Sequence, residues 1–389
     1  MKRAAIIVLD GLGIGPAPDT AAYGDAGSDT LGNVARAVGG LRLPNLERLG
    51  LGKQRSIPGL ASGVGATAAY GVALPASAGK DSTTGHWEIC GVLLSQPFRT
   101  YPNGFPRELL DEFARRTGRG WLGNKAASGT QIIAELGEEH QRTGKWIVYT
   151  SADSVFQVAA HEATIPLDEL YRACRIAREL LAGEHAVSRV IARPFAGAAG
   201  AYARTPARKD FSIPPVGETL LDRLAAAGIP RVGIGKVDDL FAGRNIASEH
   251  TPTNRDAYRL IERALEHTET GFIFVNVIEF DQTWGHRNDV PGFYEGLREL
   301  DAWLPRLESR LKGEDLIILT ADHGNDPTTP STDHSREAVP ILVLGPRVRA
   351  VAVGERRTFA DMGATVAEYF EVGSGGAGAG TSFLSSVWT

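Results

Sequence analysis

Residues 316–334 read LIILTADHGNDPTTPSTDH, and this stretch indicates the fold of the chain. It opens with an uninterrupted apolar run, which is typical of a strand buried on both faces of a parallel sheet. The run leads to Asp322 and His323, and His334 follows after a loop rich in Pro, Thr and Ser. Because ligands collect at the carboxyl ends of strands in open α/β sheets, we expect these three side chains at the rim of a site.

The same pattern occurs twice more in the chain. The apolar run at residues 4–9 leads to Asp10, and the run FIFVNVIEF at residues 272–280 leads to Asp281, with His286 close behind. A single Asp-His pair can simply be the polar end of a strand. Three predicted strands that each bring an aspartate to one sheet edge, two of them with histidines, instead indicate ligands for a divalent transition metal.

Residues 73–91, ALPASAGKDSTTGHWEICG, place three hydroxyl side chains beside Lys80. These are Ser82, Thr83 and Thr84. A hydroxyl near metal ions can lose its proton and become a nucleophile. The alternative interpretation is an ordinary Ser/Thr helix cap. The two interpretations are compatible, because a helix N-terminus also favours a bound phosphate.

The length of 389 residues suits two domains. The sequence pattern of residues 96–214 differs from that of the rest of the chain. Charged helical segments alternate there with short strands, and several arginines occur. We expect residues 1–95 and 215–389 to form a catalytic core, with a largely parallel sheet flanked by helices. We expect residues 96–214 to form an inserted α/β cap domain. Arginines suit phosphate through their planar donors, although any single one can be a surface charge.

Composition argues against several classes of partner. The net charge of -5 provides no global basic field for nucleic acid or an anionic membrane. The sequence contains no apolar run of transmembrane length. Cys90 and Cys174 show neither metal-type spacing nor a disulfide framework, which fits a reducing compartment. Asp10 interrupts the N-terminal apolar run too early for a secretory signal. We therefore expect a cytoplasmic protein that binds neither nucleic acid nor membranes.

Eight ordered motifs resemble the phosphopentomutase family of the alkaline phosphatase superfamily, over nearly the whole chain. They are VLDGLGIGPAPD, DAGSDTLG, GKDSTTGHWEICG, NKAASGT, YTSADSVFQVAAHE, RVIARPF, TADHGNDPTTPSTDHSRE and GTSFL. The resemblance implies interconversion of ribose 1-phosphate and ribose 5-phosphate, or of the deoxyribose pair, in nucleoside salvage and catabolism. It implies two Mn²⁺ ions, with other divalent cations possible, and a sugar 1,6-bisphosphate or pentose 1,5-bisphosphate as activator. Pentose phosphates are the expected partners. A monomer is expected, although the oligomeric state stays open.

The resemblance also implies roles for individual residues. One metal would be held by Asp10, Asp322, His323 and the nucleophile Ser82. The other metal would be held by Asp281, His286 and His334. The matching substrate positions are Ser151, Asp153, Arg189, Ile191 and Lys236. In this family the phosphorylated enzyme donates its phosphate to the sugar, forms a bisphosphate and takes back the other phosphate.

One position departs from the family pattern, because Ser82 stands where Thr is usual. Serine keeps the hydroxyl, and alignment on Lys80 and Asp81 favours Ser82 over the neighbouring threonines. Two other functions stay open at this point. A metal-dependent phosphomonoester hydrolase could use the same core, and a phosphosugar-binding protein could have the fold without catalysis. The preference for ribose or deoxyribose is also open.

Overall fold

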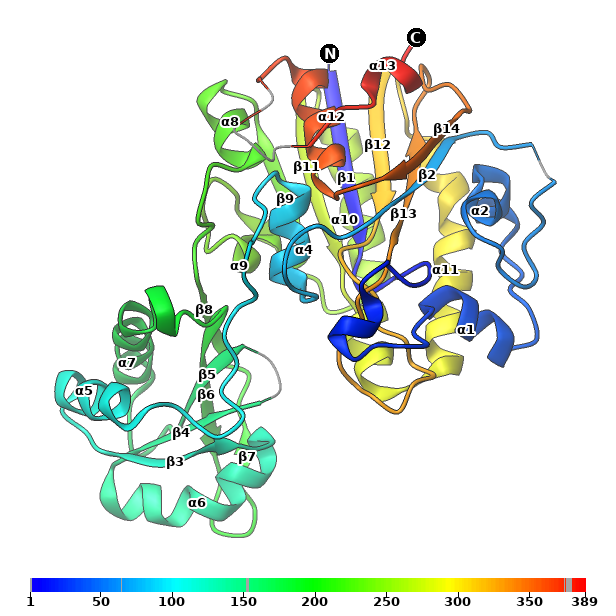
Figure 1. Cartoon of the computed structure of the whole chain (residues 1–389). Coiled ribbons are helices and arrows are strands. Elements are labelled where there is room, and N and C mark those ends of the chain that lie inside the picture. The colour runs from blue at the N-terminus through cyan, green and yellow to red at the C-terminus, as the bar shows by residue number, and fades with distance from the viewer. Residues whose placement is uncertain (1, 64, 152–153, 374, 376–379) are drawn as a thin grey trace. The chain divides into compact units, whose positions relative to one another are not determined.

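The computed structural model describes residues 2–63, 65–151, 154–373, 375 and 380–389 (Figure 1). The chain divides into two compact units. The core unit comprises Met1–Pro97 and Pro215–Thr389, and the cap unit comprises Phe98–Pro214. No helix within the described ranges is both long and apolar enough to cross a membrane.

The core unit is built on an eight-stranded sheet with the order β10-β9-β11-β1-β12-β13-β2-β14. Neighbouring strands are parallel except at β13, which runs antiparallel to both β12 and β2. The predicted largely parallel sheet is therefore confirmed. The strands are β1 (Lys2–Leu9), β2 (Ala69–Ala73), β9 (Arg231–Ile234), β10 (Ser248–Glu249), β11 (Gly271–Val277), β12 (Glu314–Thr320), β13 (Val339–Leu344) and β14 (Ala352–Arg356).

The three central strands end level with one another. Leu9 of β1 pairs with Val277 of β11, and Val8 pairs with Thr320 of β12. All seven residues of β11 are buried, as expected for an apolar strand covered on both faces. The residues that follow these strands therefore meet at one edge of the sheet.

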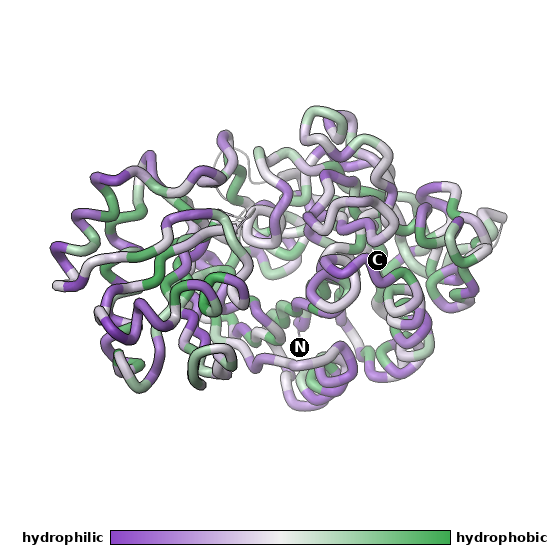
Figure 2. The backbone as a smooth tube through the Cα atoms, turned by 90° about the horizontal axis from the view of Figure 1, so that it is seen from below, coloured by the Kyte–Doolittle hydropathy of each residue, from purple (hydrophilic) through white to green (hydrophobic). Residues whose placement is uncertain are grey.

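Helices cover both faces of the core sheet (Figure 1). One layer contains α4 (Ser82–Ile89), α8 (Leu220–Ala226), α9 (Val237–Leu240) and α12 (Ala360–Phe370). The other layer contains α1 (Thr30–Ala37), α2 (Pro44–Leu49), α10 (Asn254–His267) and α11 (Val290–Glu308). Hydrophobic and hydrophilic segments alternate along the outer helices in Figure 2, which is typical of helices with one buried face. The short helices α3 (Leu51–Gln54) and α13 (Leu384–Val387) and the 3-10 helix η1 (Thr20–Tyr23) also belong to this unit.

The prediction of a strand over residues 272–280 was wrong at its end. Pairing between β11 and β1 stops at Val277, and the chain leaves the sheet. The backbone N–H of Glu279 donates to Oδ1 of Asn254 at 2.9 Å, and this hydrogen bond holds the segment after β11 at the start of α10. A π-helical turn, η3 (Phe280–Trp284), and a 3-10 turn, η4 (Gly285–Arg287), follow. Asp281 therefore lies in a turn rather than at the strand end. The sequence also predicts a glycine-rich linker at residues 373–380, which lies largely outside the described residues.

The cap unit has a sheet with the order β3-β4-β5-β6-β7, and β8 also pairs with β6. Helices α5 (Arg107–Thr117) and α7 (Leu167–Leu180) pack on one face around Phe113, Trp146 and Phe156. Helix α6 (Gly129–Thr143) packs on the other face through Ile132, whose cluster includes Tyr149 and Phe195. The strands are β3 (Trp121–Ala126), β4 (Trp146–Thr150), β5 (Val155–His161), β6 (Arg189–Ala196), β7 (Ala203–Arg204) and β8 (Lys209–Ser212).

Candidate active site

The N-terminus of α4 meets the sheet edge formed by β1, β11 and β12. Ser82 is the first residue of α4, and the side chain of Asp81 caps the helix by accepting from Thr84 N at 3.1 Å. The close approach depends on Gly85, because a Cβ at this position would lie 2.2 Å from the backbone oxygen of Asp322. The helix can therefore bring a hydroxyl directly over the strand ends.

A first cluster of polar side chains surrounds this hydroxyl. Ser82 Oγ lies 3.3 Å from Oδ1 of Asp10 and 3.1 Å from Nε2 of His323. The same His323 nitrogen lies 3.3 Å from Asp10 Oδ1 and 3.5 Å from Oδ2 of Asp322. Asp10, Asp322 and His323 are all buried, so their charges interact in a medium of low dielectric constant.

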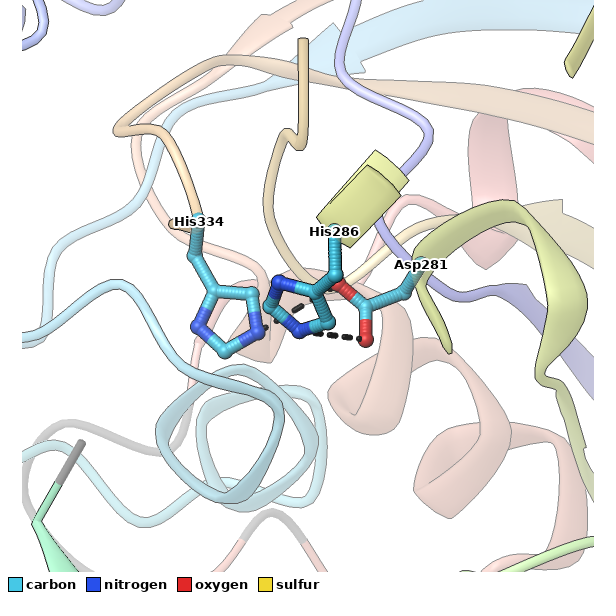
Figure 3. Close-up of side chains that lie close together, drawn as sticks. All are labelled: Asp281, His286 and His334. Carbon is cyan, nitrogen blue, oxygen red and sulfur yellow. Dashed lines mark ion pairs between the residues drawn. The ribbon is translucent and has the colours of Figure 1, made fainter. Parts of the chain in front are cut away.

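A second cluster consists of Asp281, His286 and His334 (Figure 3). Nε2 of His286 lies 3.1 Å from Oδ2 of Asp281, and Nε2 of His334 lies 3.3 Å from its Oδ1. The imidazoles reach this carboxylate from different segments, since His286 belongs to η4 and His334 to the loop after β12. One carboxylate and two ring nitrogens thus point toward a common centre.

The two clusters adjoin. Asp10, Asp281 and His323 each offer a ligand atom, and these atoms lie within 4.8 Å of one another. The rings of His323 and His334 are 4.2 Å apart between centroids. The structure therefore brings together all seven residues that the family resemblance assigns to two metals.

The three candidate hydroxyls point to different partners. Ser82 Oγ contacts the first cluster, as given above. Thr84 Oγ1 donates to Oδ2 of Asp81 at 2.6 Å and so belongs to the helix cap. Thr83 is buried, with 2% of its surface exposed. The geometry favours Ser82 as the reactive hydroxyl.

The site carries a surplus of buried negative charge. Burial, followed by repulsion from Asp322 and Asp281, raises the pKa of Asp10. Burial would also raise the pKa of Asp281, but His334 and His286 hold it well below its usual range. Among the described residues, Oδ2 of the buried Asp322 accepts no well-aligned hydrogen bond, although Nδ1 of His86 lies 3.1 Å away. Carboxylates that repel one another, with a buried oxygen left to coordinate, fit divalent cations.

Comparisons with known proteins agree with this geometry. The sequence matches the metalloenzyme superfamily over residues 2–374. It is 54% identical to the phosphopentomutase of Carboxydothermus hydrogenoformans over 389 residues, which cover 100% of both chains. It is 57% identical to the phosphopentomutase of an Anaeromyxobacter species over 388 residues, 99% of each chain. The chain belongs to the phosphopentomutase family. The resemblance inferred from the sequence motifs is therefore confirmed.

Three buried residues that contact the side chains or backbone of the phosphopentomutase site were not predicted from the sequence. Asn276 Nδ2 donates to Oδ2 of Asp10 at 3.0 Å, and Asn325 Nδ2 donates to Oδ1 of Asp281 at 2.7 Å. Nδ1 of His86 lies 2.9 Å from the carbonyl oxygen of Ser82. A signal existed for Asn276, because it is the one polar residue in the apolar strand GFIFVNV. These residues orient the carboxylates and the start of α4.

The positions matched to family substrate contacts lie in both units. In the cap, Ser151 follows β4, while Arg189 opens β6 and Ile191 lies two residues further on the same face. Nη1 of Arg189 lies 3.6 Å from Oδ2 of Asp210. Lys236 belongs to the core unit, directly before α9, where its Nζ hydrogen bonds to Oε1 of Gln282. Asp153 lies outside the described residues, and the substrate roles stay predictions.

Proposed function

We propose that the chain is a phosphopentomutase that interconverts ribose 1-phosphate and ribose 5-phosphate, or the corresponding deoxyribose pair. One observation carries this proposal. In a chain 54% identical along its length to a phosphopentomutase, the Ser82 hydroxyl contacts Asp10 and His323 at the start of a helix. A mutase that works through a phosphorylated hydroxyl requires this placement of the nucleophile.

Two divalent cations, which we propose are Mn²⁺, fit the two clusters. Asp10, Asp322 and His323, with the Ser82 oxygen, would hold one cation. Asp281, His286 and His334 would hold the other, and their oxygen and imidazole donors suit Mn²⁺. When bound, such cations neutralise the charge of a transferring phosphoryl group and acidify a coordinated hydroxyl.

The residues of the chain position the phosphoryl group for two transfers. The Oγ–P bond of phosphorylated Ser82 breaks as the free hydroxyl of the pentose phosphate forms a new O–P bond, which yields a bisphosphate. Ser82 Oγ then attacks the other phosphorus atom, and that ester bond breaks. The accepting hydroxyl releases a proton in the first transfer, and the departing ester oxygen takes one up in the second. The N-terminus of α4 favours phosphate at Ser82 throughout.

Phosphorylated Ser82 makes a bisphosphate the natural activator. A sugar 1,6-bisphosphate or a pentose 1,5-bisphosphate can donate a phosphoryl group to the free hydroxyl and leave a monophosphate product. Each hydrolysis of the phosphoserine would inactivate the enzyme until it is primed again. In a cell this activity would serve nucleoside salvage and catabolism.

The deciding experiment measures isomerised sugar phosphate against released inorganic phosphate. The purified chain is primed with a sugar bisphosphate and given ribose 1-phosphate, with and without Mn²⁺. We expect ribose 5-phosphate as the main product and little inorganic phosphate. Stoichiometric release of inorganic phosphate would instead show a phosphomonoester hydrolase. Binding of ribose phosphate without turnover would show a non-catalytic protein.

A further inference from the structure

One face of the cap sheet carries a row of side chains that extends beyond the family substrate positions. Tyr149 of β4 pairs with Gln157 of β5, Gln157 pairs with Ile191 of β6, and Ile191 pairs with Asp210 of β8. Since paired residues share a face, these four side chains form one line across the sheet. Arg193 follows two residues after Ile191 and lies on the same face.

Two cations on this face lie beside the carboxylate of Asp210. Arg208 binds Asp210 through two hydrogen bonds of 2.7 Å, and Arg189 lies 3.6 Å from the same carboxylate. Arg193 instead donates its Nε to the neutral Oε1 of Gln157 at 3.0 Å. Burial, with repulsion from Arg208 and Arg204, lowers the pKa of Arg193 to about 10. Its guanidinium therefore stays charged at neutral pH, and its described hydrogen bond goes to a neutral amide rather than to a carboxylate.

A hydroxyl on the same face also lacks a partner. Tyr149 is 1% exposed, and within the described part of the chain its phenol oxygen forms no hydrogen bond. Burial raises the pKa of this phenol, so it remains a neutral donor. A buried polar group without a partner is costly, and a bound ligand can remove that cost.

The phenol lies beneath the N-terminus of α6. A Cβ on Gly129, the first residue of this helix, would be 2.9 Å from the Tyr149 oxygen and 3.5 Å from Nη1 of Arg204. The glycine lets the helix start, the phenol and the guanidinium approach one another. Gly129 belongs to the motif NKAASGT, which the proposed function leaves unexplained. The 15-residue helix adds a positive dipole end to the cationic face.

We propose that Arg193, Arg204, Arg208 and the Tyr149 hydroxyl form a phosphate-binding subsite at the N-terminus of α6. The guanidinium groups supply charge and paired N–H donors, and the phenol supplies one neutral donor. The ligand is the phosphate group of a sugar phosphate. The assignment of the sugar rests on the proposed function, whereas the phosphate chemistry rests on the cap unit itself.

Binding is tested on the full chain after its metals are removed by a chelator. Calorimetry measures the affinity for ribose 5-phosphate and for inorganic phosphate. Arg193→Gln should weaken the ribose 5-phosphate affinity about tenfold, the value expected for loss of one charge-assisted hydrogen bond. If the wild-type chain does not bind phosphate, or if Arg193→Gln binds it as tightly as the wild type, the subsite is overturned. Binding of inorganic phosphate but not of ribose 5-phosphate overturns the sugar phosphate as ligand.

Tyr149→Phe supplies a sharper test, because this change removes a hydroxyl that makes no described hydrogen bond within the protein. We expect an unchanged or higher Tm together with about threefold weaker phosphate affinity. Tyr171→Phe is the matched control. Its hydroxyl donates to the carbonyl oxygen of Ala207 at 2.7 Å, and its ring packs on the opposite face of the sheet. The control should lower the Tm and leave phosphate affinity unchanged, and the reverse pattern would contradict the proposal.

Activity measurements separate this proposal from the proposed function. In the metal-loaded enzyme, Arg193→Gln should raise the KM for ribose 5-phosphate more than it lowers kcat. If the wild-type chain shows no mutase activity but Arg193→Gln still loses phosphate binding, the subsite stands and the proposed function fails. If the wild-type chain is an active mutase and the variant keeps its KM and its phosphate affinity, the subsite fails and the proposed function stands.

Discussion

The Ser82 hydroxyl lies 3.1 Å from Nε2 of His323, although 241 positions separate the two residues in the chain. The contact exists because the N-terminus of α4 meets the end of β12. The carbonyl oxygen of Gly324 lies 3.0 Å from Nδ1 of the same imidazole and so fixes the orientation of the ring. The hydroxyl and the imidazole are therefore held in contact by the fold itself.

Ser82 is predicted to carry the phosphate. Ser82→Ala should abolish phosphorylation and mutase turnover, and mass spectrometry after priming with a sugar bisphosphate locates the phosphate. Ser82→Thr should stay active with less hydrolysis of the phosphoenzyme, because the added methyl group shields the phosphorus from water. Phosphate found on Thr83 or Thr84, or a fully active Ser82→Ala enzyme, would contradict the assignment.

His334→Ala should lower the Mn²⁺ content from the proposed two ions per chain to one, because His334 belongs to the second cluster with Asp281 and His286. Asp322→Ala should weaken the other ion, and activity should fall in both variants. Metal analysis after dialysis gives the ratio of metal to protein. His267→Ala is the control, since His267 is exposed at the end of α10 and its Nδ1 lies 2.8 Å from the carbonyl oxygen of Arg263. Full metal content and full turnover in the first two variants would refute the two clusters as metal sites.

Arg189→Ala should impair turnover of ribose phosphates without loss of metal. Arg189 opens β6 and lies 3.6 Å from Asp210, so its guanidinium is held at the sheet edge. A missing charge-assisted hydrogen bond costs about 1.5–3 kcal/mol, or roughly tenfold to a hundredfold in kcat/KM. Arg107→Ala, at an exposed helix start in the cap, serves as control. Unchanged kinetics in Arg189→Ala would make this residue an ordinary surface charge.

Asn325→Leu should weaken metal binding while the fold stays intact. Its amide orients Asp281 through a 2.7 Å hydrogen bond, and loss of such a supporting contact typically costs about 10–100-fold in metal affinity. Competition with a chelating dye measures the Mn²⁺ affinity, and thermal unfolding checks the fold. Asn45→Leu is a matched control, because Asn45 donates to Asp301 at 3.1 Å away from the site. Equal Mn²⁺ affinity in the wild type and Asn325→Leu would exclude this role.

Glu337 is predicted to make stability depend on pH. Burial raises its pKa to about 7, against the donors Thr30, Ser335 and Gly15 N, which act to lower it. The raised folded-state pKa stabilises the protein below the unfolded value near 4.5, and this contribution is lost as the pH rises through about 7. The loss amounts to about 3 kcal/mol. Denaturant unfolding at pH 5 and pH 8 should show this decline in the wild type relative to Glu337→Gln. The prediction is disproved if the free energies of unfolding of the two proteins differ by the same amount at both pH values.

The sequence by itself determined where the central strands lie and which polar residues follow them. Short apolar runs are typical of strands buried on both faces, and parallel strands bring Asp10 and Asp322 to one edge of the sheet. The sequence also indicated a helix that starts near these hydroxyls, although its cap is Asp81 rather than a serine or threonine. These features depend on local pattern and short-range capping, which a single sequence displays directly.

Only the tertiary structure decided the rest of the site. Asp281 lies in a π-helical turn, because its strand loses its partner at Val277. Asn276 and Asn325 act on carboxylates 266 and 44 positions away. The Tyr149 hydroxyl has no hydrogen-bond partner among the described residues, and it faces Gly129 at the start of α6. Such contacts arise from packing between segments remote in sequence, and no local pattern of residue types specifies which side chains will meet.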